Sequence, residues 1–330
     1  MRTATLLSSG GHRLAALAVG GICALALAAC GSSASSAGGD QSVTVAIPPV
    51  VSGVDVYVAQ EQGFFSRHHL TVSVKVLNGG AAIVPAMESG AVDIGETNVV
   101  SVIQGASHNI AEPCFTGANT DPSTGAYLSL VTSKGSGVTT AAGLRGRTVA
   151  VNATNGVNQL LVQAYLDAHG VSPTSVHFIS LQYADMPQAL NSNRVAAAVT
   201  SEPFTTISVG NGNHLLTGNP LQSVPGTPTY SCWNASAKWL SDNHTAAADY
   251  AAAMSDTDAW IAANPAKFRT IAAKHLTIAP ATLAKITLPV FTAELSQQDI
   301  TAWETVAHKY GLIPSSPKNS DVLSPVSAGS

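Results

Sequence analysis

Short stretches of alternating hydrophobic and polar residues recur along the chain and are separated by glycine-containing turns. Val43–Ile47 and Leu70–Leu77 alternate in this way and are predicted strands, and 90–95 is expected to be a third, shorter strand. Helices are expected between them, over Val54–Gln62 and Ala81–Ser89. This order of strands and helices is typical of a parallel α/β sheet.

The same rhythm starts again after the glycine-rich turn at 135–137. The elements expected there are strands over 147–151, 177–181 and 195–200 and helices over 156–169 and 185–192. From Ala246 onward the pattern is mainly helical, and Ser296 with Asp299 forms a helix-capping signature. The hydrophobic pattern therefore predicts two α/β lobes followed by a helical region.

The composition permits a large buried core and excludes one class of partner. Of the 330 residues, 45% are hydrophobic and only 10% are charged, so the chain is unlike a disordered segment. Lys and Arg number 15 against 19 Asp and Glu, the net charge is -4, and no basic block is present. A nucleic acid is not expected as a partner, because nothing in this sequence would follow a phosphate backbone.

Residues 1–29 have the composition of an export signal, with Arg2 and Arg13 ahead of the apolar stretch Leu14–Ala29 and no acidic residue. The stretch ends in Leu-Ala-Ala-Cys, which resembles the bacterial lipoprotein signal box and implies cleavage before Cys30 and attachment of a lipid to its thiol. Residues 30–42 are rich in Ser and Gly and would form the flexible, lipid-anchored tether. The alternative is an ordinary secretion signal in which Cys30 is incidental.

Two cysteines remain after the signal and the lipidated residue are set aside. Cys114 and Cys232 form a single pair in an oxidising compartment, which indicates one disulfide. The alternative is two separate buried thiols, because spacing alone does not establish a contact.

Five ordered motifs give the chain a family resemblance. The motifs are Tyr57–Phe65 with its Ala-x-x-x-Gly-Phe-Phe pattern, Ala86–Ile94, Leu144–Val151, Glu202–Pro203 and Tyr310–Pro314. Together, across residues 43–315, they resemble the nitrate/sulfonate/taurine and thiamine-precursor family of ABC-transporter solute-binding proteins. The match departs from the family at Asn191–Asn193, where a glycine and an acid are usual, but asparagine tolerates the left-handed backbone such a turn needs.

The resemblance implies an α/β fold of the periplasmic-binding-protein-like (type II) kind, a two-lobed clamp with two hinge crossings. The first lobe would comprise 43–131 with 225–330 and the second 132–224, with crossings near 131–135 and 220–230. The family's topology would also place the strands of Cys114 and Cys232 side by side, which implies a disulfide between them.

Ligands of open α/β sheets bind beyond the carboxyl ends of the strands, and the loops there supply the candidate site. The expected ligand-binding residues are Gly53, Val54, Asp55, Gly79, Gly80, Glu96, Thr97, Asn98, Thr154, Asn155, Gly156, Val157, Tyr183, Glu202 and Phe204. None is Lys or Arg, which favours a neutral or cationic solute, such as a pyrimidine-like heterocycle. Asp55 could instead be a helix cap and Glu202 a hinge carboxylate bonded to backbone amides, while Tyr183 and Phe204 are either stacking or core residues.

The function that the resemblance implies is solute capture between the lobes. The chain would be a monomeric lipoprotein, anchored at the extracytoplasmic face of the bacterial cell membrane, that delivers a small molecule to an ABC permease with a cytoplasmic ATPase. No metal or other cofactor and no catalysis are expected, and His68–His69 is interpreted as solvated surface. The alternatives are a ligand sensor without transport and, less favoured because of the export signal, an enzyme similar to the thiamine-pyrimidine synthases.

Overall fold

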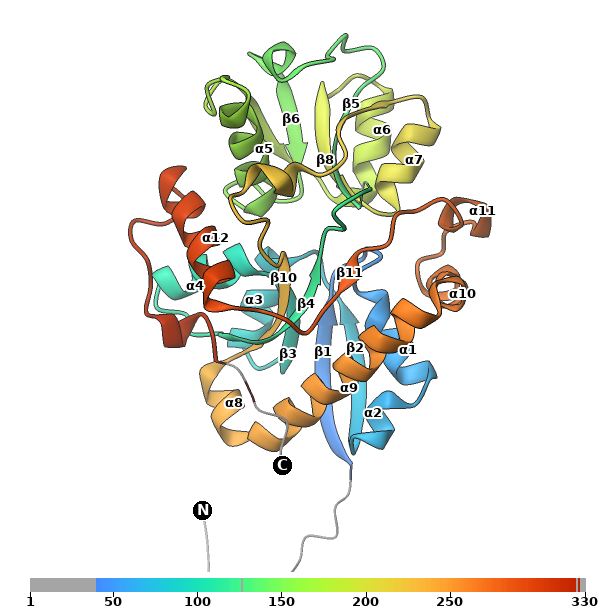
Figure 1. Cartoon of the computed structure of the whole chain (residues 1–330), viewed down its shortest axis with the longest axis vertical. Helices are drawn as coiled ribbons and strands as arrows, with labels where there is room; N and C mark the ends of the chain where they lie inside the picture. The colour runs from blue at the N-terminus through green and yellow to red at the C-terminus, as the bar shows by residue number, and fades with distance from the viewer. Residues whose placement is uncertain (1–39, 126, 325, 327–330) are drawn as a thin grey trace, which may run out of the picture. The chain divides into compact units, whose positions relative to one another are not determined.

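The strands of this protein form two separate sheets in a computed structural model that describes residues 40–125, 127–324 and 326 (Figure 1). The predicted signal peptide, Cys30 and most of the predicted tether lie outside these residues. Among the residues described, no helix is long and apolar enough to cross a membrane.

The first sheet has six strands in the order β11-β4-β10-β3-β1-β2. Their bounds are β1 (Gln41–Ile47), β2 (Leu70–Val76), β3 (Ile94–Asn98), β4 (Cys114–Thr120), β10 (Ser231–Ala235) and β11 (Val290–Phe291). β1 pairs in parallel with β2 and β3, whereas β10 runs antiparallel between β3 and β4. The carboxyl ends of β1 and β3 therefore lie at one edge of the sheet, where a ligand is expected.

Helices cover both faces of the first sheet. One face is covered by α1 (Val54–Glu61), α2 (Phe64–Arg67) and the long α9 (His244–Ala263). The opposite face is covered by α3 (Gly80–Glu88) and α4 (Val99–Ser107) (Figure 1). A Cβ on Gly95 of β3 would lie 2.4 Å from Ile83 of α3, so glycine permits the close packing of that helix. Residues alternate between the faces along a strand, and Glu96 therefore points to the α1 and α9 side.

The second sheet has five strands in the order β7-β6-β8-β5-β9. Its strands are β5 (Leu128–Thr132), β6 (Thr148–Val151), β7 (His177–Ser180), β8 (Ala197–Ser201) and β9 (His214–Thr217). The helices of this lobe are α5 (Val157–Ala168), α6 (Met186–Asn191) and α7 (Phe204–Gly210), with 3-10 turns over Ala141–Leu144, Tyr183–Asp185 and Pro220–Ser223. The strand β6 pairs in parallel with β7 and β8, so this lobe repeats the parallel core of the first.

The first crossing between the sheets falls earlier in the chain than the family resemblance implied. Leu128–Thr132 pairs antiparallel with β8 in the second sheet, so the chain crosses at 121–127 rather than at 131–135. Every residue of this strand, β5, is buried, so exposed and buried positions do not alternate along it. The hydrophobic pattern therefore does not mark where the strand begins. The second crossing connects Thr217 to Ser231 and includes the expected 220–230.

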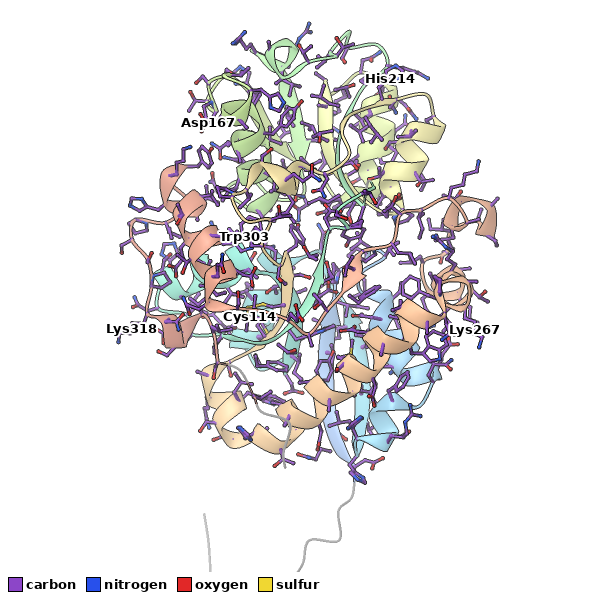
Figure 2. All side chains as sticks on the ribbon, in the orientation of Figure 1. Cys114, Asp167, His214, Lys267, Trp303 and Lys318 are labelled. Carbon is purple, nitrogen blue, oxygen red and sulfur yellow. A yellow bond between two sulfur atoms is a disulfide. The ribbon has the colours of Figure 1, made fainter. Side chains whose placement is uncertain are left out.

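The remaining helices close the first lobe. They are α8 (Ala237–Asp242), α10 (Pro265–His275), α11 (Pro280–Leu283) and α12 (Gln297–Lys309), followed by a 3-10 turn over Asn319–Asp321. The predicted capping box opens α12, because the Ser296 hydroxyl accepts from the Asp299 amide and the Asp299 carboxylate accepts from the Ser296 amide. Buried Trp303 of α12 donates to the Thr229 carbonyl at 2.8 Å, which fixes the helix against the second crossing (Figure 2).

Three local details differ from or refine the sequence expectations. β3 begins at Ile94 rather than at residue 90, because the Asp93 carboxylate accepts from the Thr44 amide at 2.7 Å and holds the preceding turn. β1 begins at Gln41, so the end of the expected tether is already paired in the sheet. Asn193 has a φ of 55°, the left-handed backbone that asparagine was expected to tolerate.

The structure joins Cys114 and Cys232 in a disulfide with a Cα–Cα distance of 5.7 Å. The two residues lie on the neighbouring strands β4 and β10, as the family topology implied, but not directly opposite each other. Cys114 is opposite Asn234 and Cys232 opposite Gly117, because the pairing is irregular on both sides of Cys232–Trp233. Both cysteines are fully buried.

Candidate functional site

A small polar cavity, here called the inner cavity, lies where the two lobes meet. It has a volume of about 40 Å³ and receives side chains from both sheets and both crossings. The first lobe contributes Ser52, Glu96, Thr97 and Asn98, whereas the second contributes Asn152, Tyr183 and Ser201. Tyr127 and Tyr230 reach it from the two crossings. A cavity of this size holds one or two water molecules or one small functional group of a larger solute.

Glu96 is the acidic group of the inner cavity and is 2% exposed. Its Oε1 accepts from Asn119 Nδ2 at 2.8 Å and from the Ser231 hydroxyl at 3.5 Å, while Oε2 has no hydrogen-bond partner. Burial raises the pKa of Glu96 to about 7, and the neighbouring polar groups of Ser52, Asn119 and Ser231 lower it in part. The cavity is therefore lined by a carboxyl group with one buried oxygen that has no hydrogen-bond partner.

A buried asparagine, Asn158 of α5, positions two tyrosines that line the inner cavity. Its Nδ2 donates to the Tyr183 hydroxyl at 2.8 Å and to Asn152 Oδ1 at 2.9 Å, and its Oδ1 accepts from the Tyr230 hydroxyl at 3.3 Å. Burial raises the pKa of Tyr183 to about 12, so its hydroxyl keeps its proton at neutral pH. One side chain thus fixes cavity-lining groups from the second lobe and from the second crossing.

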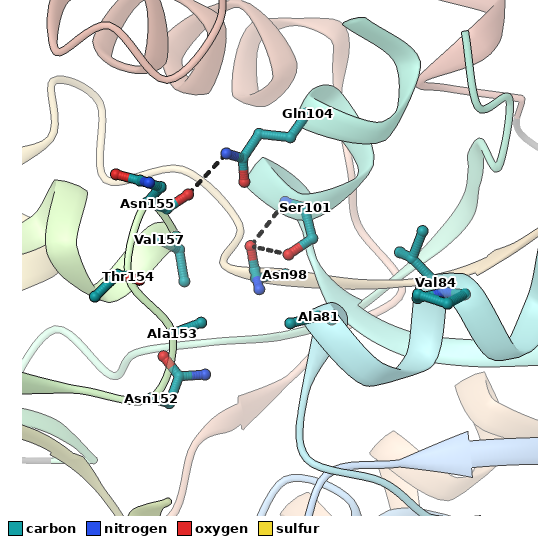
Figure 3. Close-up of a pocket in the computed structure, with 13 residues that line it drawn as sticks. Ala81, Val84, Asn98, Ser101, Gln104, Asn152, Ala153, Thr154, Asn155 and Val157 are labelled. Atoms are coloured by element: carbon teal, nitrogen blue, oxygen red, sulfur yellow. Dashed lines mark hydrogen bonds between the residues drawn. The ribbon is translucent and has the colours of Figure 1, made fainter. Parts of the chain in front are cut away.

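A larger space, here called the outer cavity, adjoins the inner one and shares Gly80, Asn98 and Asn152 with it (Figure 3). Its volume is about 210 Å³. It lies between the start of α3, the start of α4 and the β6–α5 loop over 152–157. Helix starts carry unpaired backbone N–H groups, so this cavity offers neutral hydrogen-bond donors and a weakly positive field.

Side chains and glycines bring the walls of the outer cavity close together. Asn98 caps α4, because its Oδ1 accepts from the Ser101 amide at 2.9 Å and from the Ser101 hydroxyl at 3.1 Å. A Cβ on Gly80 would lie 2.4 Å from the Ser101 hydroxyl oxygen, so only glycine permits this approach of α3 to α4. Gln104 Nε2 donates to the Asn155 carbonyl at 2.8 Å and joins the two lobes across the cavity (Figure 3).

Glu202 joins the lobes and does not line either cavity. Its carboxylate accepts from the Thr206 amide and hydroxyl at 3.0 and 2.8 Å and from the Thr287 amide at 3.2 Å. Its carbonyl accepts from the Val51 amide at 3.0 Å. Burial raises the pKa of Glu202 despite these hydrogen bonds. This geometry matches the hinge carboxylate that was the alternative for Glu202.

Asp55 also lies away from the two cavities. It is fully buried in the first turn of α1, where Oδ1 accepts from the Val56 amide at 2.7 Å and Oδ2 has no partner. Burial and then the neighbouring carboxyls of Glu96 and Asp258 raise its pKa well above the usual range. Asp55 therefore lies in the same buried acidic neighbourhood as Glu96 but lines neither cavity.

The other predicted residues fall into two groups. Those that line the inner or outer cavity are Gly79, Gly80, Glu96, Thr97, Asn98, Thr154, Asn155, Gly156, Val157 and Tyr183. Gly53, Val54 and Phe204 instead line a separate, mainly apolar pocket beside Tyr57 and His275. Tyr127, Tyr230 and Asn158 were missed; the two tyrosines lie in the crossings, which the strand pattern does not mark, and Asn158 lies inside a helix.

Comparisons with known proteins assign the chain to a family. A family model described as NMT1/THI5 like matches residues 53–268, about two thirds of the chain. A curated relative, a putative ABC transporter periplasmic binding protein of Brachyspira hyodysenteriae, is 22% identical over 213 residues. The match covers 62% of this chain and 61% of that protein.

Solved structures show the same fold at low identity. The alkanesulfonate-binding protein SsuA of Xanthomonas axonopodis pv. citri, bound to MOPS, has a TM-score of 0.70 at 17% identity and covers 86% of this chain and 96% of its own. The nitrate-binding protein NrtA of Synechocystis has a TM-score of 0.68 at 13% identity, with coverages of 85% and 84%. The two-lobed clamp expected from the sequence is confirmed by these similarities.

Proposed function

Because the chain belongs to the NMT1/THI5-like family, we propose that it is the solute-binding component of an ABC importer. It captures a small molecule between its lobes and delivers it to a permease driven by a cytoplasmic ATPase. The observation that carries this proposal is the inner cavity, whose polar lining comes from both lobes and both crossings. A solute bound there contacts both lobes together, which favours the closed arrangement over an open one.

The lining of the inner cavity supports a neutral or cationic solute. Of the described residues that line it, Glu96 is the acidic one and none is Lys, Arg or His. Tyrosines 127, 183 and 230 supply aromatic surface together with hydroxyl groups, which suits a planar nitrogen-containing group. Alkanesulfonate and nitrate are bound by the two structural neighbours, and this lining offers such anions no cationic side chain.

The extracytoplasmic location and the anchor are parts of the same proposal. Lipidation at Cys30 would hold the folded unit at the outer face of the cell membrane, beside the permease. A Cys30→Ala variant would then lose incorporation of labelled palmitate and leave the membrane fraction. Palmitate labelling that persists in this variant would remove the anchor from the proposal.

A thermal-shift screen tests solute capture directly. The full chain in mild detergent is screened against amines, guanidinium compounds, pyrimidines, thiamine, sulfonates and nitrate. A solute that binds only the folded state stabilises it by about 2.7 kcal/mol at a hundredfold excess over its Kd. A flat response across all classes would contradict the proposal for the solutes tested.

A pair of variants shows whether a hit occupies the proposed cavity. Asn152→Ala changes a residue shared by both cavities and is expected to weaken binding at least about tenfold through the loss of one buried hydrogen bond. Asn211→Ala, at an exposed asparagine of the same lobe, is the matched control and should bind normally. Equal binding by both variants would place the solute elsewhere.

Transport is tested in cells. Uptake of the radiolabelled hit is measured in a strain that lacks the gene, and in the same strain complemented with the wild type or with Asn152→Ala. Uptake that returns only with the wild type supports delivery to a permease. Normal uptake without the gene would assign the bound solute to sensing instead.

A further inference from the structure

We propose that solute capture in the inner cavity releases a proton from Glu96, so that the cleft selects a protonated nitrogen group and releases it as the pH falls. This inference rests on the proposed function and adds to it the chemical class of the recognised group and a control on its release.

The first support is the geometry of the Glu96 carboxyl. Asn119 holds Oε1 at 2.8 Å, which fixes the side chain, and Oε2 of this cavity-lining residue is buried without a hydrogen-bond partner. A buried carboxylate with an unpartnered oxygen is costly, because the surroundings replace none of its lost hydration. An N–H donor in the cavity would supply the missing partner.

The second support is the set of groups behind Glu96. Asp55 on α1 is fully buried with an unpartnered Oδ2, and Asp258 on α9 adds a third carboxyl to the same electrostatic neighbourhood. Tyr250 of α9, also fully buried, has an unpartnered hydroxyl and interacts with all three acids. These groups are acidic or neutral, so none of them neutralises an ionised Glu96.

The remaining neighbours of Glu96 also supply no positive charge that would neutralise its carboxylate. Ser231 of β10 donates to Glu96 at 3.5 Å, and Tyr127 of the first crossing is pushed to a higher pKa by burial and then by Glu96. Burial places the pKa of Glu96 at about 7, and that of Asp258 at about 8. In the empty cleft Glu96 is therefore protonated below neutral pH.

The exchange balances in atoms and charge. A solute cation donates its N–H to Glu96 Oε2, the carboxyl proton leaves to bulk water, and the bound state contains a cation paired with a carboxylate. No covalent bond of the solute forms or breaks. Below the pKa each binding event releases one proton, so affinity falls about tenfold for each unit of pH.

The test uses methylguanidinium, a planar cation whose charged end matches the size of the inner cavity. Its Kd is measured calorimetrically on the full chain at about pH 6 and about pH 8, in two buffers of different ionisation enthalpy. We expect binding about tenfold weaker at the lower pH and nearly one proton released there, falling toward none at the higher pH.

Glu96→Gln keeps an oxygen acceptor for Asn119 but has no proton to release. This variant should bind methylguanidinium at least about tenfold more weakly at the higher pH and with no pH dependence. Glu88→Gln, at an exposed glutamate that ends α3 in the same lobe, is the matched control and should behave like the wild type. If Glu96→Gln does not fold, the ¹³C carboxyl shift of Glu96 in the wild type replaces it, and we expect a midpoint near 7 that methylguanidinium lowers.

The outcomes separate this inference from the proposed function. Binding of methylguanidinium with the same Kd at both pH values overturns the proton coupling but leaves solute capture intact. Binding of a sulfonate or nitrate without methylguanidinium also overturns it. If no compound of the screen binds at either pH, both the inference and the proposed function fail.

Discussion

The two lobes differ in how many acidic side chains they bury. The first lobe buries Asp55, Glu96 and Glu112 and half-buries Asp258, and burial raises the pKa of each. The second lobe places Asp167 of α5 at the surface, where the Lys309 ammonium and then the Tyr310 hydroxyl lower its pKa (Figure 2). Burial thus disfavours ionised carboxylates inside the first lobe and at Glu202, where the second lobe joins it, whereas the surface position of Asp167 favours the ionised form.

The two lobes also contribute different kinds of groups to the inner cavity. The first lobe contributes the titratable group of the inner cavity, whereas the second contributes neutral groups from Asn152, Tyr183 and Ser201. The disulfide lies in the first lobe, where Cys232 follows Ser231 on β10, and the sequence has no cysteine between 128 and 217. A lobe that holds a costly buried carboxyl gains from a cross-link that resists its local opening.

The largest expected effect comes from removing that cross-link. The Cys114→Ala, Cys232→Ala double variant opens a loop with a sequence separation of 118 residues, so we expect a loss of about 2 to 5 kcal/mol in unfolding free energy. Denaturant unfolding measures it, and reduction of the wild type is the control. Two free thiols in the unreduced protein would show that the bond is absent from the purified chain.

The next effect is a pH dependence of stability that originates in the first lobe. The folded-state pKa of Glu96, about 7, lies above the ordinary value of 4.5, so its stabilising contribution is full below about 4.5 and is lost as the pH rises through about 7. The shift corresponds to about 3 kcal/mol. We expect the wild type to be more stable near pH 5 than near pH 8, measured by denaturant unfolding.

Glu96→Gln isolates this contribution. The variant should lose much of the difference between the two pH values, because its amide does not titrate. The Asp167→Asn variant of the second lobe is the comparison, and its exposed side chain should leave the slope between pH 5 and pH 8 unchanged. A slope that is equal in the wild type and in Glu96→Gln would assign the pH dependence to other buried acids, such as Glu112.

A smaller effect is expected at Glu202, where the lobes are joined. Glu202→Ala removes the acceptor of the Thr206 and Thr287 amides, and unpaired buried donors cost about 1 to 3 kcal/mol. Glu202→Gln keeps an acceptor and should recover part of the loss. Thermal unfolding measures the stability, and small-angle scattering should show a more open particle for Glu202→Ala. Scattering that matches the wild type would limit Glu202 to a local role.

Much of the fold followed from the hydrophobic pattern because regular strands and helices have local signatures. The helix expected over 54–62 is α1, and the strand expected over 147–151 is β6. β5 and β9 were not predicted, since their short sequences depend on pairing with β8 and with each other rather than on local alternation.

The sequence predicted which loops form the site, but not how their side chains are arranged in space. Glu96 and Asn98 follow from the rule that ligands bind at strand ends, and they do line the inner cavity. Asp55 and Glu202 follow the same rule but point elsewhere, because side-chain direction depends on packing that the sequence does not resolve. Tyr127 reaches the cavity only because the first crossing falls at 121–127, which is a property of the tertiary fold.

The smallest expected effect separates a cap from a ligand contact at Asn98. Asn98→Ala removes the cap of α4, which costs about 1 kcal/mol, and also removes an amide at both cavities. Asn98→Asp keeps an oxygen for the Ser101 amide and adds a charge that a helix start favours, so thermal unfolding should match or exceed the wild type.

Binding then distinguishes the two roles. In Figure 3 the Asn98 amide nitrogen points away from the capping contacts, and only this N–H donor is lost in Asn98→Asp. If the solute accepts from that donor, both variants bind weakly although only Asn98→Ala is less stable. If Asn98→Asp binds normally, or binds a cation more tightly because of its added charge, Asn98 shapes the cleft through α4 alone. In the second lobe, the N-cap residue of α5 is Gly156, which has no side chain to cap the helix, so this pair of substitutions has no counterpart at α5.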